Sequence, residues 1–275
     1  MRSIREQVIL VTGTTDGLGR AVAGELANAG ATVLLHGRDP KRSRRTIDNI
    51  RAQSGNEKLG RYEADFSSLD EVRKMSEHVL REQKRLDVLV NNAGIGTTIP
   101  GDGERMESKD GYELRFAVNY LAGFLLTRLL EPLLRCSAPA RIVNVSSAGQ
   151  MPIDFSDVML EHGYSGTRAY CQSKLAQVIF TFDLADELRD TGVTANCLHP
   201  ATYMPTKMVL AARGSAVSTL EDGVRATTRL ITAPELEGVS GRYFNGLHEA
   251  RADEQAYEAD ARRRLRELSE RLVGL

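Results

Sequence analysis

The chain has 275 residues, of which 41% are hydrophobic and 27% charged, and its formal net charge is −1. This composition is typical of a globular protein that is long enough to bury a substantial core. A near-neutral charge gives no general attraction for nucleic acid or an anionic membrane. The three cysteines are widely spaced and form no C-x-x-C pair, so we expect no metal site and a cytoplasmic location.

No segment has the pattern of a targeting or membrane-spanning sequence. Residues 1–7 lack the apolar core of a signal peptide. The longest apolar stretch, Leu121–Leu134, is interrupted by Arg128 and Glu131, and it is too short and too charged to span a bilayer. We therefore expect no membrane insertion.

Short apolar runs alternate with helix-length amphipathic segments. The runs are typical of parallel strands covered on both faces, and they are Val8–Val11, Thr32–Leu35, the less apolar Arg61–Glu63, Val88–Val90, Ile142–Val145 and Val193–Leu198. The predicted helices are Leu18–Ala29, Lys41–Gln53, Leu69–Gln83, Gly111–Arg135 and Ala169–Arg189. Asp39 and Ser67 are candidate helix caps. The alternation predicts an α/β fold with a single domain over residues 1–275: a Rossmann-type, doubly wound parallel sheet with helices on both faces.

The C-terminal segment Ala252–Leu272 is predicted to be a charged helix. Its arginines allow two interpretations, a nucleic-acid patch or a solvated helix face. Acidic residues are interleaved with the arginines, which favours the solvated face. We expect no nucleic-acid partner.

A glycine-rich segment, Thr12–Gly19, follows the first strand and opens the first helix. Glycines let the backbone turn sharply, and a helix N-terminus offers free N–H groups to a phosphate. The spacing is G-x-x-x-G-x-G, not G-x-G-x-x-G. A purely structural turn is the alternative, but the position between strand and helix favours dinucleotide binding. The candidate cofactor-binding residues here are Gly13, Thr15, Asp16, Gly17, Leu18 and Gly19.

Four further motifs follow in order. They are Asn91-Asn92-Ala93-Gly94, Asn119, Ser146-Ser147 and Tyr170-x-x-x-Lys174. Together with the glycine-rich segment they resemble the short-chain dehydrogenase/reductase family over Gln7 to about Met208. The residues from Arg141 to Ser147 and from Ala169 to Lys174 are similar to the retinol-dehydrogenase-like branch. Unlike many members of that branch, this chain is expected to be soluble, without an N-terminal membrane anchor.

Tyr170 and Lys174 lie four residues apart and so share one face of a helix. A nearby ammonium favours the phenolate and brings the pKa of a tyrosine toward the working pH. The resemblance implies that Tyr170 exchanges a proton with the substrate oxygen. It also implies that Lys174 lowers the pKa of Tyr170 and holds the nicotinamide ribose. An exposed pair without a role is the alternative.

The resemblance implies two further catalytic residues. Ser147 would bind the substrate oxygen, although either serine of the pair could simply satisfy the backbone at a strand end. Its separation from Tyr170 is longer than in many members, which places extra residues at 150–168. Asn119 would hold a water that links Lys174 to solvent; a satisfied core amide is the alternative.

The resemblance also implies a path for the cofactor. Asn92, Ala93 and Gly94 would pass along its riboses, and Asp65 and Phe66 would contact the adenine, although Asp65 could be a helix-start acid. Pro200 would lie at the nicotinamide, with Ala201 where the family usually has glycine. We favour Thr206 over Thr202 for the carboxamide contact. Tyr170 and Lys174 contribute to binding as well.

The end of the second strand indicates which nicotinamide cofactor is used. An NAD site places an acid there to bind the ribose hydroxyls. That position is Gly37, and Arg38 follows, whose guanidinium can bind a 2′-phosphate. The sequence thus predicts NADP(H).

The predicted function is hydride transfer between NADPH and a carbonyl or alcohol group of a mainly apolar small molecule. An NADP(H)-binding regulator without turnover is the alternative, but it needs none of the four catalytic side chains. The apolar loops at about 150–168 and 202–225 are candidate substrate walls; packing on their own subunit or at an interface would explain them equally.

Leucines occupy more than one stripe of Tyr120–Leu134, so this helix must be buried on most sides. The resemblance implies that it pairs with the Tyr170 helix across a two-fold axis, which predicts a homodimer or homotetramer. Burial within one subunit is the alternative.

Overall fold

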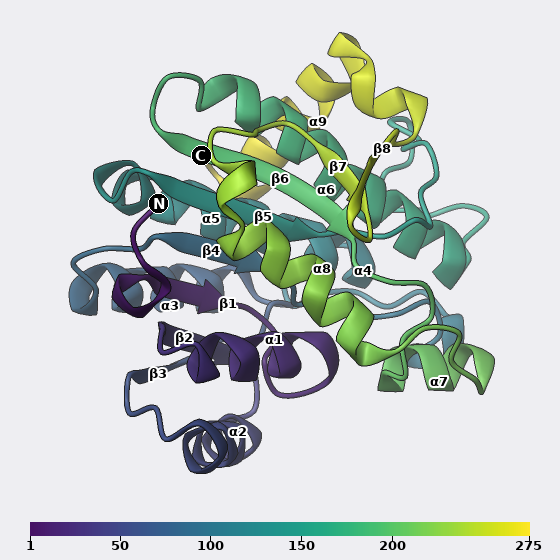
Figure 1. Cartoon of the computed structure of the whole chain (residues 1–275). Helices are drawn as coiled ribbons and strands as arrows, with labels where there is room; N and C mark the ends of the chain where they lie inside the picture. The colour runs from purple at the N-terminus through teal and green to yellow at the C-terminus, as the bar shows by residue number, and fades with distance from the viewer.

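A computed structural model describes residues 1–275 as an eight-stranded sheet covered by helices on both faces (Figure 1). The strand order is β3-β2-β1-β4-β5-β6-β7-β8, and all neighbours are parallel except β7 and β8. The doubly wound α/β fold is therefore confirmed. The strands are β1 Val8–Val11, β2 Thr32–Gly37, β3 Leu59–Glu63, β4 Val88–Asn91, β5 Ala140–Val145, β6 Val193–His199, β7 Tyr243–Asn245 and β8 His248–Ala250.

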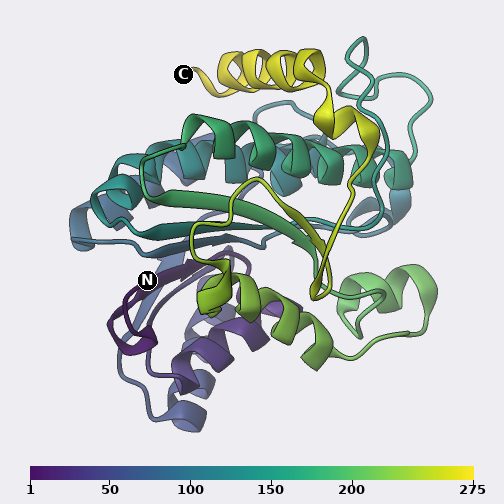
Figure 2. The same ribbon diagram turned by 45° about the horizontal axis from the view of Figure 1, so that its top comes forward.

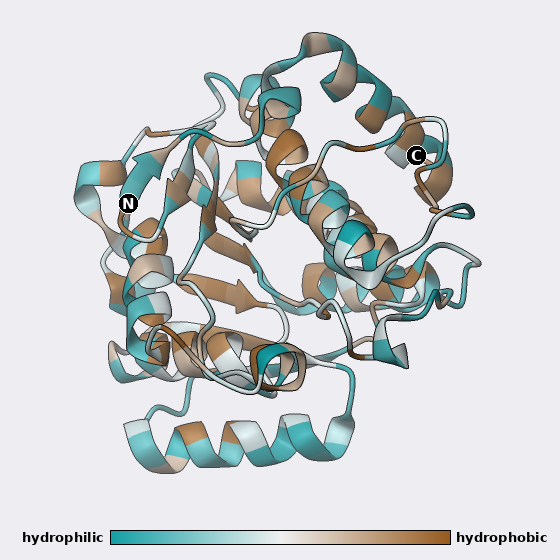
Figure 3. Cartoon of the chain, turned by 90° about the vertical axis from the view of Figure 1, so that its right-hand side faces the viewer, coloured by the Kyte–Doolittle hydropathy of each residue, from teal (hydrophilic) through white to brown (hydrophobic).

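The helices form a layer on each side of the sheet. Figure 2 shows α1 and α8 on one face, α5 and α6 on the other, and α9 outside α6. The helices are α1 Gly17–Asn28, α2 Pro40–Ser54, α3 Leu69–Glu82, α4 Leu114–Phe116, α5 Ala122–Cys136, α6 Gly166–Glu187, α7 Lys207–Arg213, α8 Leu220–Thr232 and α9 Ala259–Val273. Hydrophobic residues line the strands and the helix faces directed at them (Figure 3), which gives one buried cluster on each face of the sheet.

The expected caps are partly confirmed. The carboxylate of Asp39 accepts the N–H groups of Lys41 at 2.9 Å and Arg42 at 3.0 Å, so it begins α2 as predicted. The cap of α3 is Ser68 and not Ser67, because the Ser68 hydroxyl is the one that accepts Glu71 N–H.

Two predicted helices differ in shape. The segment predicted as helix from Gly111 begins at Leu114 and contains a π-helical turn at Ala117–Leu121, where Ala122 N–H bonds Ala117 O. The C-terminal segment is split by Glu258 into a short 3-10 helix, Glu254–Tyr257, and α9.

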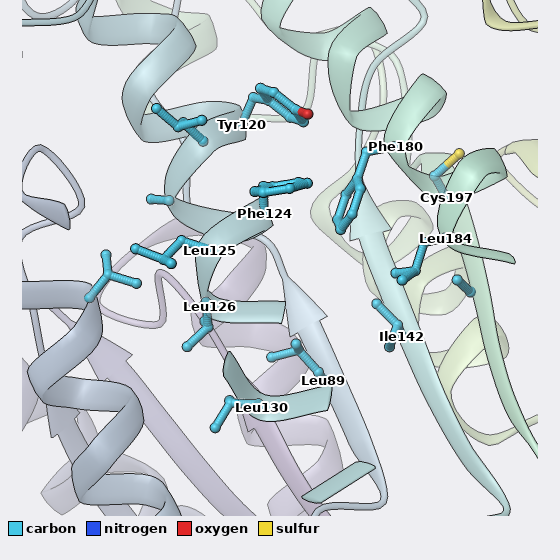
Figure 4. Packing of buried hydrophobic residues seen from close by; sticks show 14 of the residues in the cluster. Leu89, Tyr120, Phe124, Leu125, Leu126, Leu130, Ile142, Phe180, Leu184 and Cys197 are labelled. Atoms are coloured by element: carbon cyan, nitrogen blue, oxygen red, sulfur yellow. The ribbon is translucent and has the colours of Figure 1, made fainter. Parts of the chain in front are cut away.

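The leucines of α5 are explained within the single chain. Leu125, Leu126 and Leu130 are fully buried, and the aromatic rings of Phe124 and Phe180 lie 5.0 Å apart (Figure 4). By length and composition Phe116–Cys136 could cross a membrane, but 61% of its apolar window is buried inside the fold. The helix is therefore a core helix in this structure.

Helix α9 covers α6, the helix expected to pair with a second subunit. Arg266 Nη1 lies 2.9 Å from Asp183 on α6, and Ser269 bonds the Tyr120 hydroxyl at 2.7 Å. The buried side chains of Leu265 and Val273 join the core on that face. Four arginines of α9, Arg262, Arg263, Arg264 and Arg266, lie within ion-pair distance of carboxylates.

Candidate active site

The glycine-rich turn between β1 and α1 is packed too closely for side chains. Gly13 has φ +72°, and a Cβ there would lie 2.8 Å from Ala93 Cα. A Cβ on Gly19 would lie 2.3 Å from Asn92 Nδ2, which donates to Thr12 O at 2.7 Å. The turn is thereby tied to the Asn92–Gly94 segment, and it leads into the N-terminus of α1.

The imidazole of His36, on β2, is hydrogen-bonded to this turn. Its Nδ1 accepts Gly13 N–H at 3.2 Å, and its Nε2 lies 3.0 Å from Ala64 O. Its ring stacks on Phe66 with centroids 4.2 Å apart. Burial lowers the pKa of His36 to about 4, so the ring is neutral and accepts at Nδ1. Phe66 thus has a supporting role beneath the expected adenine position.

Asp65 ends the β3 segment beside Lys109. Burial disfavours its charged form, but bonds from Ser67 and the Lys109 ammonium outweigh this and lower the pKa of Asp65. Its Oδ1 accepts Ser67 N–H at 3.0 Å, which is the helix-start role considered as the alternative. The second oxygen lies 3.5 Å from Lys109.

Two arginines flank the expected position of the adenosine ribose. Arg38 is exposed and has no ion pair or side-chain hydrogen bond in the chain. Arg42, one turn into α2, lies 3.4 Å from both Thr15 O and Asp16 Oδ2. Sequence reasoning missed Arg42, although its position four residues after Arg38 was a usable signal.

Ser147 and Tyr170 come together at the carboxyl end of β5. A Cβ on Gly149 would lie 3.5 Å from Ser147 Oγ and 3.9 Å from Tyr170 Cε1, so both side chains border one space. Burial raises the pKa of Tyr170, and the Ser147 hydroxyl partly opposes this effect. Ser146 instead donates to Lys174 O at 2.7 Å and is buried. This geometry agrees with Ser147 as the substrate-binding member of the pair.

Lys174 lies on the same face of α6 as Tyr170, with Nζ 5.8 Å from the phenol ring centroid. Nζ donates to Val145 O at 3.0 Å and Gln177 Oε1 at 2.8 Å. Burial lowers the pKa of Lys174 to about 7. In this structure burial is therefore the largest influence on the pKa of Tyr170. The lowering of that pKa expected from the sequence requires the Lys174 amine to be fully charged.

Asn119 lies in the π-helical turn and is 1% exposed. Its Oδ1 accepts Ile95 N–H at 2.7 Å, and its Nδ2 donates to Ser173 Oγ at 3.0 Å. The side chain is therefore satisfied by protein, as in the core-amide alternative. A Cβ on Gly94 would lie 3.1 Å from Asn119 Oδ1 and 3.6 Å from Lys174 Nζ, so both groups border the space beside Gly94.

The segment after β6 passes over the phosphate turn. Ala201 has no positive φ, so alanine fits where the family usually has glycine after Pro200. Thr202 Oγ1 is engaged with His199 Nε2 at 3.1 Å, whereas the Thr206 methyl lies 3.2 Å from the Cβ position of Gly17. The preference for Thr206 is consistent with this geometry.

Residues after Thr206 also contact the cofactor turn. Lys207 Nζ lies 3.0 Å from Asp16 Oδ2. Burial disfavours the Asp16 carboxylate, but Lys207 and the Gly17 N–H outweigh this and lower its pKa. A Cβ on Gly96 would lie 2.4 Å from Met208 Cγ, so Met208 packs beside the Asn92–Gly94 segment.

Each predicted substrate loop has some apolar side chains packed in the core and others exposed, so packing and a substrate wall each explain part of it. In the first, Ile153 is buried in the core, and Phe155, Val158 and Met159 pack against it. In the second, Met204 joins the core on the other face. Several large apolar side chains of the two loops remain exposed by about 40% or more: Met151 41%, Tyr203 43% and Leu210 45%.

The C-terminal segment fixes the first loop. Gln150 donates to Ser147 O at 2.9 Å and accepts Asp253 N–H at 2.9 Å. Gln255 bonds both backbone groups of Ile153, at 2.7 and 3.1 Å. The position of the loop beside Ser147 thus depends on residues far along the chain.

One cavity of about 620 Å³ lies away from these residues. It lies near the amino ends of β5 and β6, where Arg141, Val193 and Arg262 line it. None of the four catalytic candidates lines this cavity. Ligands of open α/β sheets bind at the carboxyl ends of the strands, so the site is placed by chemistry and not by cavity size.

The described residues fit a nicotinamide cofactor. Gly13 and Gly19 have no room for a Cβ, and the turn that contains them leads into the N-terminus of α1. A nicotinamide cofactor held here would supply or accept a hydride. Tyr170 would then be placed to exchange a proton with the substrate oxygen, Ser147 to orient that oxygen, and Lys174 to provide positive charge beside Gly94.

A tightly packed glycine-rich turn that opens a helix, with a tyrosine and a buried lysine on one helix face at the same edge of the sheet, is the arrangement of a nicotinamide-dependent oxidoreductase. A family model described as short chain dehydrogenase matches residues 7–215, and the chain belongs to this family. The chain is accordingly an oxidoreductase that acts on alcohol or carbonyl groups, and the predicted resemblance is confirmed.

Relatives place it in the retinol-dehydrogenase-like branch. It is 37% identical to retinol dehydrogenase 13 of Mus musculus, with 99% of this chain and 85% of that protein covered. It is also 37% identical to retinol dehydrogenase 14 of Homo sapiens, covering 98% and 87%. Among solved structures, an Escherichia coli CFT073 short chain dehydrogenase complexed with NADPH is 26% identical, with TM-score 0.72 and coverage of 88% and 97%.

Proposed function

We propose that the protein transfers a hydride between NADP(H) and an alcohol or carbonyl group of a mainly apolar small molecule. One observation carries the proposal: Tyr170 and the Ser147 hydroxyl border the same space beside Gly149, and Tyr170 lies on one helix face with the buried Lys174. A protein that only binds the cofactor has no need of this arrangement.

The preference for NADP(H) rests on charge. Gly37 offers no carboxylate to ribose hydroxyls, while the unpaired Arg38 and the nearby Arg42 offer two guanidinium groups to a 2′-phosphate. The NADPH complex of the Escherichia coli relative supports this choice.

The apolar substrate is supported by the loops around the site. Met208 packs on Gly96, and Met151, Tyr203 and Leu210 present apolar surface from the two loops. Isolated apolar residues are normal on a surface, but several in segments that border one site favour an apolar ligand. The names of the relatives indicate retinol, an apolar primary alcohol, as a model substrate.

The deciding experiment measures NADPH binding and NADPH oxidation in parallel over a panel of ketones and aldehydes, with NADP⁺ reduction by retinol as the reverse assay. We expect turnover with apolar members of the panel. Tight NADPH binding without turnover on any member would support a cofactor-binding regulator instead.

We also propose a cytoplasmic homodimer or homotetramer, as the sequence favours. Because α9 occupies the outer face of α6, such an assembly must use another surface. Light scattering at micromolar concentration and cell fractionation test these two points.

A further inference from the structure

The ammonium of Lys174 is held by a side chain that has no assigned role. Nζ donates to Gln177 Oε1 at 2.8 Å and to Val145 O at 3.0 Å. Gln177 lies three residues further along α6, so the two side chains share a helix face. Gln177 is only 4% exposed, so bulk water does not readily replace its side-chain oxygen.

No carboxylate stabilises the charged form of Lys174. Burial is the cause that lowers its pKa to about 7, and no carboxylate offsets it. The groups that face it are Tyr170 on its own helix, Asn119 beside Gly94, and the carbonyl of Val145 on β5. A buried ammonium is stable only to the extent that acceptors replace its lost hydration. The amide oxygen of Gln177 is one of two such acceptors.

We propose that Gln177 is a positioning residue for hydride transfer, whose amide oxygen keeps the Lys174 amine charged and directed along the face of α6 that carries Tyr170. The proposal rests on the family's reaction and adds a residue to it. Gln177 touches neither substrate nor reacting atoms; it acts through Lys174.

A buried polar chain holds the backbone of α6 at Gln177. Thr181 donates to Gln177 O at 2.6 Å, and Asn144 donates to Thr181 at 2.8 Å. Asn91 continues the chain by donating to Asn144 at 2.8 Å. Every one of these residues is at most 4% exposed. This chain links the backbone of α6 at Gln177 to β5 and β4, so the point from which the Gln177 side chain projects is held at a defined place.

The consequence concerns the pH at which Tyr170 works as a base. Without the Gln177 acceptor the neutral amine is favoured, because the charged form loses a hydrogen bond that solvent does not replace. Less positive charge beside Tyr170 disfavours its phenolate. Alcohol oxidation should then require a higher pH.

The test compares Gln177→Met, which keeps the volume and removes the acceptor, with Gln177→Glu, which restores an acceptor and adds charge. Gln172→Met is the matched control, because Gln172 is a 5% exposed amide on the same helix that bonds Pro152 O instead. Two readouts are needed: the pH profile of kcat/KM for alcohol oxidation, and the titration of Lys174 by ¹³C NMR in lysine-labelled protein without cofactor, assigned with Lys174→Arg.

In Gln177→Met we expect the Lys174 pKa to fall by at least about one pH unit. The apparent pKa of the ascending limb of the rate profile should rise by at least about the same amount. In Gln177→Glu the Lys174 pKa should exceed that of the wild type, and Gln172→Met should leave the titration unchanged. A wild-type Lys174 titration in both Gln177 variants would overturn the proposal. If Gln177→Met does not fold, Gln177→Glu alone decides. The NMR titration needs no substrate, so it separates this proposal from the proposed function.

Discussion

The imidazole of His36 accepts the N–H of Gly13 at 3.2 Å and contacts Ala64 O at 3.0 Å, so one buried ring joins the phosphate turn to the end of β3. This bond requires the neutral ring, because Nδ1 must accept. A protonated His36 cannot make it.

Folding stability should therefore decrease in mild acid. Burial lowers the pKa of His36 from 6.5 to about 4, so between these values the unfolded chain binds a proton that the folded chain does not. The contribution is complete above pH 6.5 and is lost as the pH falls toward 4, on the order of 3 kcal/mol. Urea unfolding at about pH 7 and about pH 5 measures it. His36→Gln should lose less stability between the two than the wild type, and the exposed His162→Gln should match the wild type; equal losses in all three would refute the assignment.

Tyr170→Phe keeps the shape of the side chain and removes the exchangeable proton. We expect kcat to fall by at least roughly 10²-fold, the scale of general acid–base catalysis. NADPH affinity should change little, because the ring remains. Steady-state kinetics and NADPH fluorescence titration measure both, and near-normal turnover would exclude Tyr170 as the proton donor.

Cofactor preference should depend on the two arginines beside the adenosine position. Arg38→Glu and Arg42→Glu should each lower kcat/KM for NADPH by about tenfold or more and change that for NADH less, since each removes one charge-assisted bond. Arg45→Glu is the control, because it changes the same charge on an exposed position of α2 without reaching the turn. Equal kcat/KM for the two cofactors in the wild type would contradict the NADP(H) assignment.

The size of the apolar substrate should matter. In a series of ketones and aldehydes of increasing chain length, kcat/KM should rise with apolar size. Met208→Ala should reduce this rise, because Met208 packs on Gly96 beside the cofactor turn. Leu80→Ala, exposed on α3, is the control. A preference for small sugars that Met208→Ala leaves unchanged would remove these loops from the substrate site.

Helix α9 should suppress association through α6. Ending the chain after Glu258 uncovers the apolar surface that Leu265 and Val273 now cover, and such surface favours self-association. Size-exclusion chromatography with light scattering should show a higher mass for the shortened chain. Arg263→Glu, at an exposed position of α9, should leave the mass unchanged. An unchanged mass in the shortened chain would show that α6 is not an interface surface.

The sequence predicted those parts of the fold that have strong periodicity. All six predicted strands form, and five of them are buried apolar runs; β3, with Arg61 and Glu63 exposed, is the exception. The β7–β8 hairpin was not predicted, because three residues per strand carry no period and pairing with β6 determines it. Helices α7 and α8 were also missed.

The site shows a similar division. Motif spacing located Ser147, Tyr170 and Lys174, because two of them share a helix and the third ends a strand. His36, Arg42 and Gln177 were missed, since their partners, Gly13, Asp16 and the Lys174 amine, are recognised only once the chain is folded. The motif predicted that Asn119 lies in the long helix, but not that Ile95 and Ser173 would be its hydrogen-bond partners.

The contacts from Gln150 and Gln255 have a consequence for synthesis. The phosphate turn and the first five strands lie before residue 146, whereas the residues that fix the loop beside Ser147 lie at 253–255. Domains form from the N-terminus as they emerge from the ribosome. The wall beside Ser147 can therefore form only after nearly the whole polypeptide has been made, so a ribosome-bound chain has the residues of its phosphate turn long before it can discriminate among substrates.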